Sequence, residues 1–130
     1  MTDFPVFDGH NDLILRLLRG DVTAEAVASG LTDGHIDKPR AQKGGFGGGM
    51  FAIFVPSPDD KAVRHDEMSN PPYDIALPTP VTEAEATEWT ERGFDALESL
   101  EAAGAIRICR NAAEIGAALP AEEMAAVIHI

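Results

Sequence analysis

Short, mostly apolar runs alternate along the chain with stretches in which apolar residues recur every three or four positions. The runs lie at residues 5–9, 50–55, 106–109 and 124–130. A short apolar run bounded by glycine or proline is typical of a strand that is buried on both faces, as in a parallel sheet. We therefore predict four neighbouring parallel strands, joined by helices in right-handed βαβ units, and an α/β fold.

The intervening stretches carry helix start and stop signals. Thr82 and Glu85 have the spacing of a capping box, and the apolar stripe that follows them runs to Gly104. Asn111 and Glu114 have the same spacing, with Asn111 in the capping position. Together these signals predict helices over residues 13–18, 23–29, 82–103 and 111–119.

Three segments fit neither pattern. Residues 31–45 are polar and contain Gly34 and Pro39, so a loop is predicted there. Residues 56–80 hold most of the nine prolines and form a long loop, typical of a lid or excursion beside an active site. The glycine run at 44–49 has neither nucleotide-binding spacing nor a following helix, so it predicts close backbone packing or a bulge at the start of its strand.

Charge and cysteine content narrow the function classes. The 130 residues carry a net charge of −12, which excludes the basic surfaces that nucleic acids and anionic membranes require. The lone Cys109 lies in an apolar run and is predicted to be a buried thiol rather than a nucleophile. The N-terminus shows no signal-peptide pattern and no apolar run reaches ~18 residues, so a cytoplasmic protein is expected.

His10 and Asp12 form a His-x-Asp step at the end of the first predicted strand. Residues i and i+2 of a strand share one face, so this imidazole and carboxylate can hold one divalent metal ion. Because short motifs arise by chance, a strand-end histidine capped by a carboxylate is the alternative. Asp8 would share that face and could orient His10, but Asp8-Gly9 is first of all a turn signal, and a turn is our prediction.

The other histidines give weaker signals. His35 and His65 lie in polar segments and are predicted to be solvated. His129 belongs to the last apolar run and is predicted to be a packed histidine of the sheet, although it could lie near a metal.

Several short sequence motifs, in their order along the chain, resemble those of the renal (membrane) dipeptidase family, peptidase family M19. They are Phe7-Asp8-Gly9-His10-Asn11-Asp12-Leu13, His35-Ile36-Asp37 with Pro39-Arg40, the segment from Gly44 to Pro56, and Ala126-Val127-Ile128-His129-Ile130. The resemblance implies a (β/α)₈ TIM-type barrel, which needs ~250 residues. Residues 1–130 are therefore expected to be the N-terminal part of a single metallo-dipeptidase barrel domain.

The resemblance also implies chemistry and site residues. His10 and Asp12 would hold one zinc ion of a pair, and the remaining ligands, including a bridging glutamate, would follow Ile130. The parent enzyme would hydrolyse dipeptides through a metal-bridging hydroxide, and the family also allows a homodimer. Leu15 and Phe54 would stand at substrate-binding positions where mammalian members carry aromatic and tyrosine side chains.

Within these 130 residues the resemblance assigns no catalytic residue beyond the metal ligands, and two ligands cannot complete a catalytic zinc site. The chain alone is therefore expected to be inactive. Two alternatives stay open: a metal hydrolase of the amidohydrolase type that acts on another amide or ester, and a non-catalytic fragment.

Overall fold

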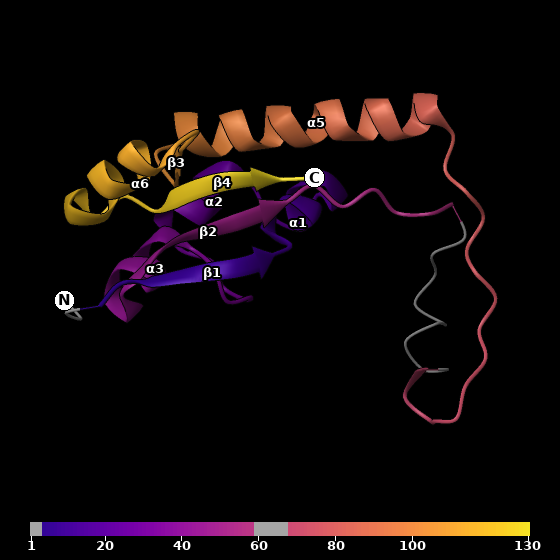
Figure 1. Ribbon diagram of the computed structural model, residues 1–130. Helices are drawn as coiled ribbons and strands as arrows, with labels where there is room; N and C mark the ends of the chain where they lie inside the picture. The colour runs from indigo at the N-terminus through magenta and orange to yellow at the C-terminus, as the bar shows by residue number, and fades with distance from the viewer. Residues whose placement is uncertain (1–3, 59–67) are drawn as a thin grey trace.

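This computed structural model describes residues 4–58 and 68–130, whose strands form a four-stranded parallel sheet (Figure 1). The strands are β1 (Val6–Asn11), β2 (Phe46–Ala52), β3 (Arg107–Ile108) and β4 (Ala125–His129). Every pair is parallel, as the alternation of apolar runs and helical stretches predicted. The spatial order is β1-β2-β4-β3, so the last strand lies inside the sheet and the two-residue β3 lies at its edge.

The helices begin and end largely where their caps predicted. They are α1 (Leu13–Arg19), α2 (Ala24–Ser29), α3 (Lys38–Gly44), α5 (Glu83–Ala102) and α6 (Ala112–Ala118). The capping box at Thr82 and Glu85 is formed, and the Asn111 side chain accepts a hydrogen bond from the backbone N–H of Glu114. α1 ends at Gly20, whose φ of 78° is left-handed and favours glycine.

The predicted loop over 31–45 is wrong for its second half, which forms α3. The Asp37 carboxylate caps this helix by accepting the backbone N–H of Arg40 at 2.9 Å, and Pro39 occupies the first turn. Proline is favoured there because its missing N–H has no partner within the helix in any case. The sequence therefore contained a helix start signal, but the polar composition of residues 31–45 led to the prediction of a loop.

The second strand was placed too far along the chain. It begins at Phe46, so Gly47, Gly48 and Gly49 lie inside the strand, while Gly44 and Gly45 end α3, and residues 53–55 follow the strand. A Cβ on Gly48 would lie 2.2 Å from the Ala125 carbonyl oxygen, and one on Gly49 would lie 2.8 Å from Cβ of Asp8. The predicted close packing is confirmed, and a register shift beside β1 supplies the predicted bulge.

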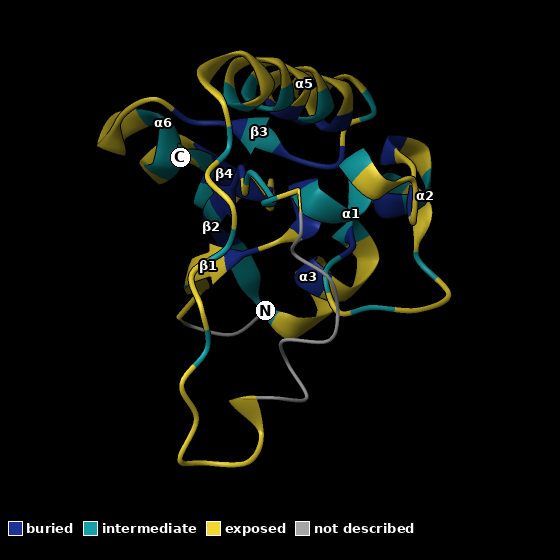
Figure 2. Ribbon diagram, turned by 90° about the vertical axis from the view of Figure 1, so that its right-hand side faces the viewer, coloured by how far each residue is buried: buried dark blue, intermediate teal, exposed yellow. Residues whose placement is uncertain are grey.

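The main core lies between the sheet and helices α1, α2 and α5. Phe51 of β2 and Leu97 and Leu100 of α5 are fully buried in it. Figure 2 shows α1 and α2 on one side of the sheet and α6 on the other. A smaller cluster on the α6 side contains Ala118 and Ala125. Both faces of the sheet thus carry apolar cover, as expected for parallel strands.

Gly93 sets how closely α5 approaches Ile53, which directly follows β2. A Cβ at this position would lie 2.7 Å from Cγ2 of Ile53, which is itself buried. We expect Gly93→Val to lower the free energy of unfolding by about 1–3 kcal/mol through overpacking. Gly116→Val in α6 is the matched control, because a Cβ added there would meet no neighbouring atom within 4 Å. Urea titration followed by circular dichroism measures both, and equal effects would contradict the packing argument.

The chain between β2 and α5 leaves the body on the side of the sheet where the strands end (Figure 1). The described residues 56–58 and 69–80 of the predicted loop contain neither helix nor strand. Residues 59–67, and with them the prediction that His65 is solvated, lie outside the described residues. In the described parts of the chain, no helix combines the length and apolarity needed to cross a membrane.

Candidate metal centre

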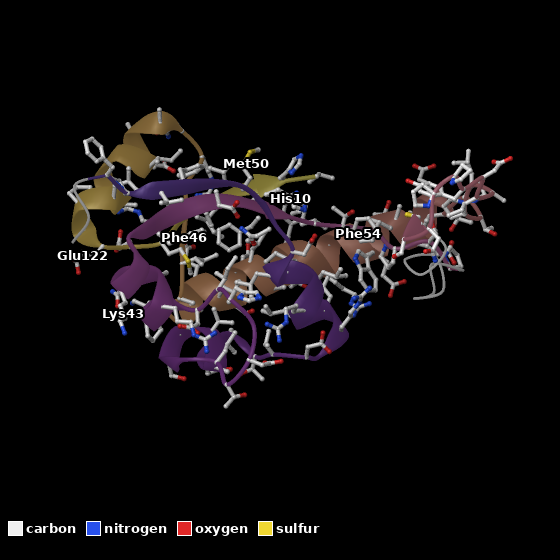
Figure 3. The ribbon with its side chains drawn as sticks, turned by 90° about the horizontal axis from the view of Figure 1, so that it is seen from below. His10, Lys43, Phe46, Met50, Phe54 and Glu122 are labelled. Atoms are coloured by element: carbon white, nitrogen blue, oxygen red, sulfur yellow. The ribbon has the colours of Figure 1, made fainter. Side chains whose placement is uncertain are left out.

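His10 and Asp12 stand where β1 gives way to α1. His10 is the penultimate residue of β1, and Asp12 is the N-terminal cap residue of α1. The Asp12 carboxylate makes no capping hydrogen bond to this helix, so its oxygens are not used by the local backbone. In Figure 3, His10 lies beyond Met50 in the direction of Phe54, at the carboxyl end of the sheet. Parallel α/β folds place their ligand sites at this end.

The two side chains meet as the His-x-Asp spacing predicted. Nε2 of His10 lies 3.3 Å from Oδ1 of Asp12, and each side chain is 55% exposed. A tetrahedral zinc ion with bonds of 2.0–2.2 Å holds its donor atoms about 3.4 Å apart. The imidazole and carboxylate thus have the separation that two ligands of one such ion require, and they remain open to solvent. The same contact is also an ion pair when His10 is protonated, as the alternative interpretation held.

Asp8 is part of β1, so the predicted turn at Asp8-Gly9 is wrong. Asp8 pairs with Gly49 and Asn11 with Phe51, so β1 has one more residue than β2 over this stretch. This bulge interrupts the alternation of side chains, which is why regular strand geometry does not relate Asp8 to His10. The Asp8 carboxylate accepts the backbone N–H of His10 at 3.3 Å, so it holds the bulged backbone that carries the imidazole.

Asn11 is a structural residue of the site that sequence reasoning missed. It is buried, and its Nδ2 donates to the Met50 carbonyl oxygen at 3.3 Å and to Oδ2 of Asp8 at 3.2 Å. Its Oδ1 accepts the backbone N–H of Leu13 at 3.3 Å, which begins α1. Asn11 therefore ties β1, β2 and α1 together between the two candidate ligands. An asparagine two residues before a helix start is an Asx-turn signal that could have identified it.

His129 is exposed, so the prediction of a packed histidine is wrong. Its ring meets that of His10 edge to face, with centroids 6.0 Å apart and an interplanar angle of 89°. His129 is the last residue of β4, where the strand reaches the open carboxyl end of the sheet. His35 is also exposed, which confirms the prediction that it is solvated. Within the described residues, no three side chains from His, Cys, Asp and Glu come together as a metal site.

The two predicted substrate-binding residues follow the carboxyl ends of two neighbouring strands, Leu15 after β1 and Phe54 after β2. Leu15 lies half-buried in α1, and Phe54 follows β2 with 44% of its surface exposed. The Phe54 carbonyl oxygen accepts a hydrogen bond from Nε1 of Trp89 at 2.7 Å, which fixes the backbone where the chain leaves the sheet. Their role towards substrate stays a prediction.

Cys109 is buried, as predicted, and it packs beside Ala118 and Ala125. Burial raises the pKa of its thiol, which disfavours the thiolate that a nucleophile needs. Its burial and its raised pKa both support a purely structural thiol.

A cavity of about 480 Å³ lies at the opposite end of the sheet from His10. Apolar side chains line much of it, including those of Pro5, Phe46, Leu119 and Met124. Figure 3 shows Phe46, Lys43 and Glu122 at this amino-terminal end. Among the described residues that line it, Glu122 and Glu123 are carboxylates but none is a histidine, so the imidazole–carboxylate pair at the carboxyl end is the candidate metal site.

The family model described as membrane dipeptidase, peptidase family M19, matches residues 1–130. The chain belongs to peptidase family M19. A protein of Acinetobacter calcoaceticus described as an uncharacterized protein in the PQQ-III 3′ region is 33% identical over 137 residues. The match covers 97% of the M19 chain and 40% of that relative.

Two solved structures resemble the M19 chain closely. One is a metallo peptidase from Rhodobacter sphaeroides, liganded with a phosphinate mimic of the dipeptide L-Ala-D-Ala, at 38% identity and a TM-score of 0.87. The other is the dipeptidase AC, a metallo peptidase of family M19, at 38% identity and a TM-score of 0.85.

The two matches cover 97% and 96% of the M19 chain but only 37% and 36% of those structures. M19 dipeptidases have a TIM-barrel fold, so the parallel sheet is the N-terminal part of such a barrel. The resemblance inferred from the sequence phrases is confirmed, and so is the fold class.

Proposed function

We propose that this chain provides the first part of the active site of a metal-dependent dipeptidase. The observation that carries the proposal is the pair formed by His10 and Asp12, 3.3 Å apart at the carboxyl end of β1 in an M19 chain. The Rhodobacter sphaeroides neighbour, with its dipeptide mimic, supports a dipeptide as the substrate class. We further propose zinc as the metal and a pair of ions in the complete barrel, because imidazole and carboxylate are both common zinc ligands.

The residues of this chain have separate tasks in the proposed reaction. Nε2 of His10 and the Asp12 carboxylate would hold one metal ion, while Asn11 fixes the backbone between them. When bound, such metal ions lower the pKa of a water molecule and polarise the amide carbonyl. Leu15 and Phe54 offer apolar surface to the side chains of the dipeptide. The other metal ligands would come from outside these residues, so the chain alone should be inactive.

A chimeric barrel tests the proposal. In it, residues 1–130 replace the matching N-terminal segment of the Rhodobacter sphaeroides metallo peptidase, to which they align with a TM-score of 0.87. We expect the chimeric barrel to hydrolyse dipeptides, to lose activity on chelation, and to regain it with zinc. Cyclic amides and lactones serve as comparison substrates. A chimera that prefers those substrates would support the amidohydrolase-type alternative, and a folded but inactive chimera would support the non-catalytic one.

A further inference from the structure

We propose that His129 is a positioning residue that holds the His10 imidazole in the orientation required for metal binding. This inference rests on the proposed function, because it assumes that His10 is a metal ligand. The observation behind it is the edge-to-face contact between the two rings, with centroids 6.0 Å apart. Aromatic rings at such separations and near-perpendicular angles attract each other beyond the burial of their surface.

The two histidines reach each other across an intervening strand. His10 is on β1 and His129 on β4, and β2 lies between these strands. Neighbouring strands lie 4.7–4.9 Å apart, so β1 and β4 are about 10 Å apart. Ring centroids only 6.0 Å apart therefore require both side chains to lean over β2 towards each other.

Ala52 provides the space for this approach. It is the residue of β2 that pairs with His129, and its side chain points away from the face on which its neighbour Phe51 enters the main core. Ala52 is only 5% exposed, yet it belongs to neither apolar cluster of the sheet. A methyl group at this position leaves room above β2, whereas a larger side chain would stand between the two rings.

His129 is itself held by the strand ladder. Its carbonyl oxygen accepts the backbone N–H of Ile53 at 2.8 Å, which anchors the end of β4 to the chain leaving β2. The His10 imidazole thus has the Asp12 carboxylate at Nε2 and the His129 ring as an aromatic neighbour. Rotation of the His10 ring would break both contacts, so His129 favours the orientation that keeps Nε2 beside Asp12.

The aromatic ring of His129, rather than a nitrogen lone pair, carries this role, and the test follows from that distinction. In the chimeric barrel, we expect His129→Ala to weaken zinc affinity about 10-fold, the usual cost of losing a residue that orients a metal ligand. His129→Phe keeps the ring and should retain the zinc affinity of the unaltered chimera. His35→Ala, which removes an exposed histidine elsewhere, is the matched control.

Zinc affinity is measured by competition with a chromophoric chelator, and thermal melts of the metal-free proteins report on folding. Unchanged zinc affinity in His129→Ala would overturn the inference. An equal loss in His129→Phe would also overturn it, because His129 would then act through its nitrogen as a ligand. A loss that only parallels a fall in melting temperature would reduce His129 to a structural role. Failure of the proposed function looks different, since zinc affinity would then also be unaffected by His10→Ala.

Discussion

Replacing His10 by alanine in the chimeric barrel should lower kcat/KM for dipeptide hydrolysis by about 10³-fold or more, which corresponds to ~4 kcal/mol on the barrier. The reason is the geometry at the end of β1, where Nε2 of His10 and Oδ1 of Asp12 have the separation of two ligands on one ion. Loss of one ligand leaves the coordination sphere incomplete, and the water that attacks the amide is no longer activated. Steady-state kinetics at saturating zinc give the ratio directly.

Asp12→Ala should have a similar effect, and the double variant should lose little more, because two ligands of one ion act as a unit. The exposed His35→Ala is the control for a general effect of removing a histidine. Nearly unchanged kinetics in either single variant would mean that the pair at the end of β1 is an ion pair of the surface and not part of a metal centre.

The 130-residue chain expressed alone should associate into oligomers. In the described part of the chain, β1 pairs only with β2, and β3 covers only Ala125 and Ala126 of β4. Unpaired strand edges recruit other chains. Exposed apolar side chains on β1 also favour association, since Val6 is 56% and Phe7 43% exposed. The net charge of −12 should slow association without removing the open edge.

Sedimentation velocity over a concentration series tests this expectation. Val6→Lys puts a charge on the exposed edge strand and should shift the distribution towards monomer. Leu77→Lys is the matched control, because Leu77 is 91% exposed but lies far from β1 in sequence, in the segment between β2 and α5. A concentration-independent monomer with a sharp two-state melt would contradict the prediction. Incorporation into the chimeric barrel should give a compact species, since the barrel pairs both edges.

Most helices with local capping signals could be predicted from the sequence, although α3 was missed despite its cap at Asp37. The caps at Thr82 and Asn111 depend on residues three positions apart, so the starts of α5 and α6 follow from the sequence directly. The start of β2 within a glycine run could not be predicted from the sequence, because those glycines fit only when Ala125 and Asp8 are packed against them. The order β1-β2-β4-β3 was equally inaccessible, since strand order depends on contacts between segments distant in the chain.

The candidate site also has parts that the sequence could predict and parts that it could not. His10 and Asp12 are two residues apart, and their spacing alone predicted that the side chains would meet. His129 is brought to His10 by the register of β4 on β2, in which it pairs with Ala52. No local pattern contains that register, so the same residue was predicted to be packed in the sheet. The bulge that moves Asp8 away from the expected alternation is likewise a property of strand pairing.

A crystal structure of the chimeric barrel grown with zinc, with anomalous data collected on both sides of the zinc absorption edge, shows directly whether His10 and Asp12 bind one ion. We expect an anomalous peak about 2.0–2.2 Å from both Nε2 of His10 and the Asp12 carboxylate. A peak bound elsewhere in the barrel, with His10 and Asp12 contacting only each other, would contradict it.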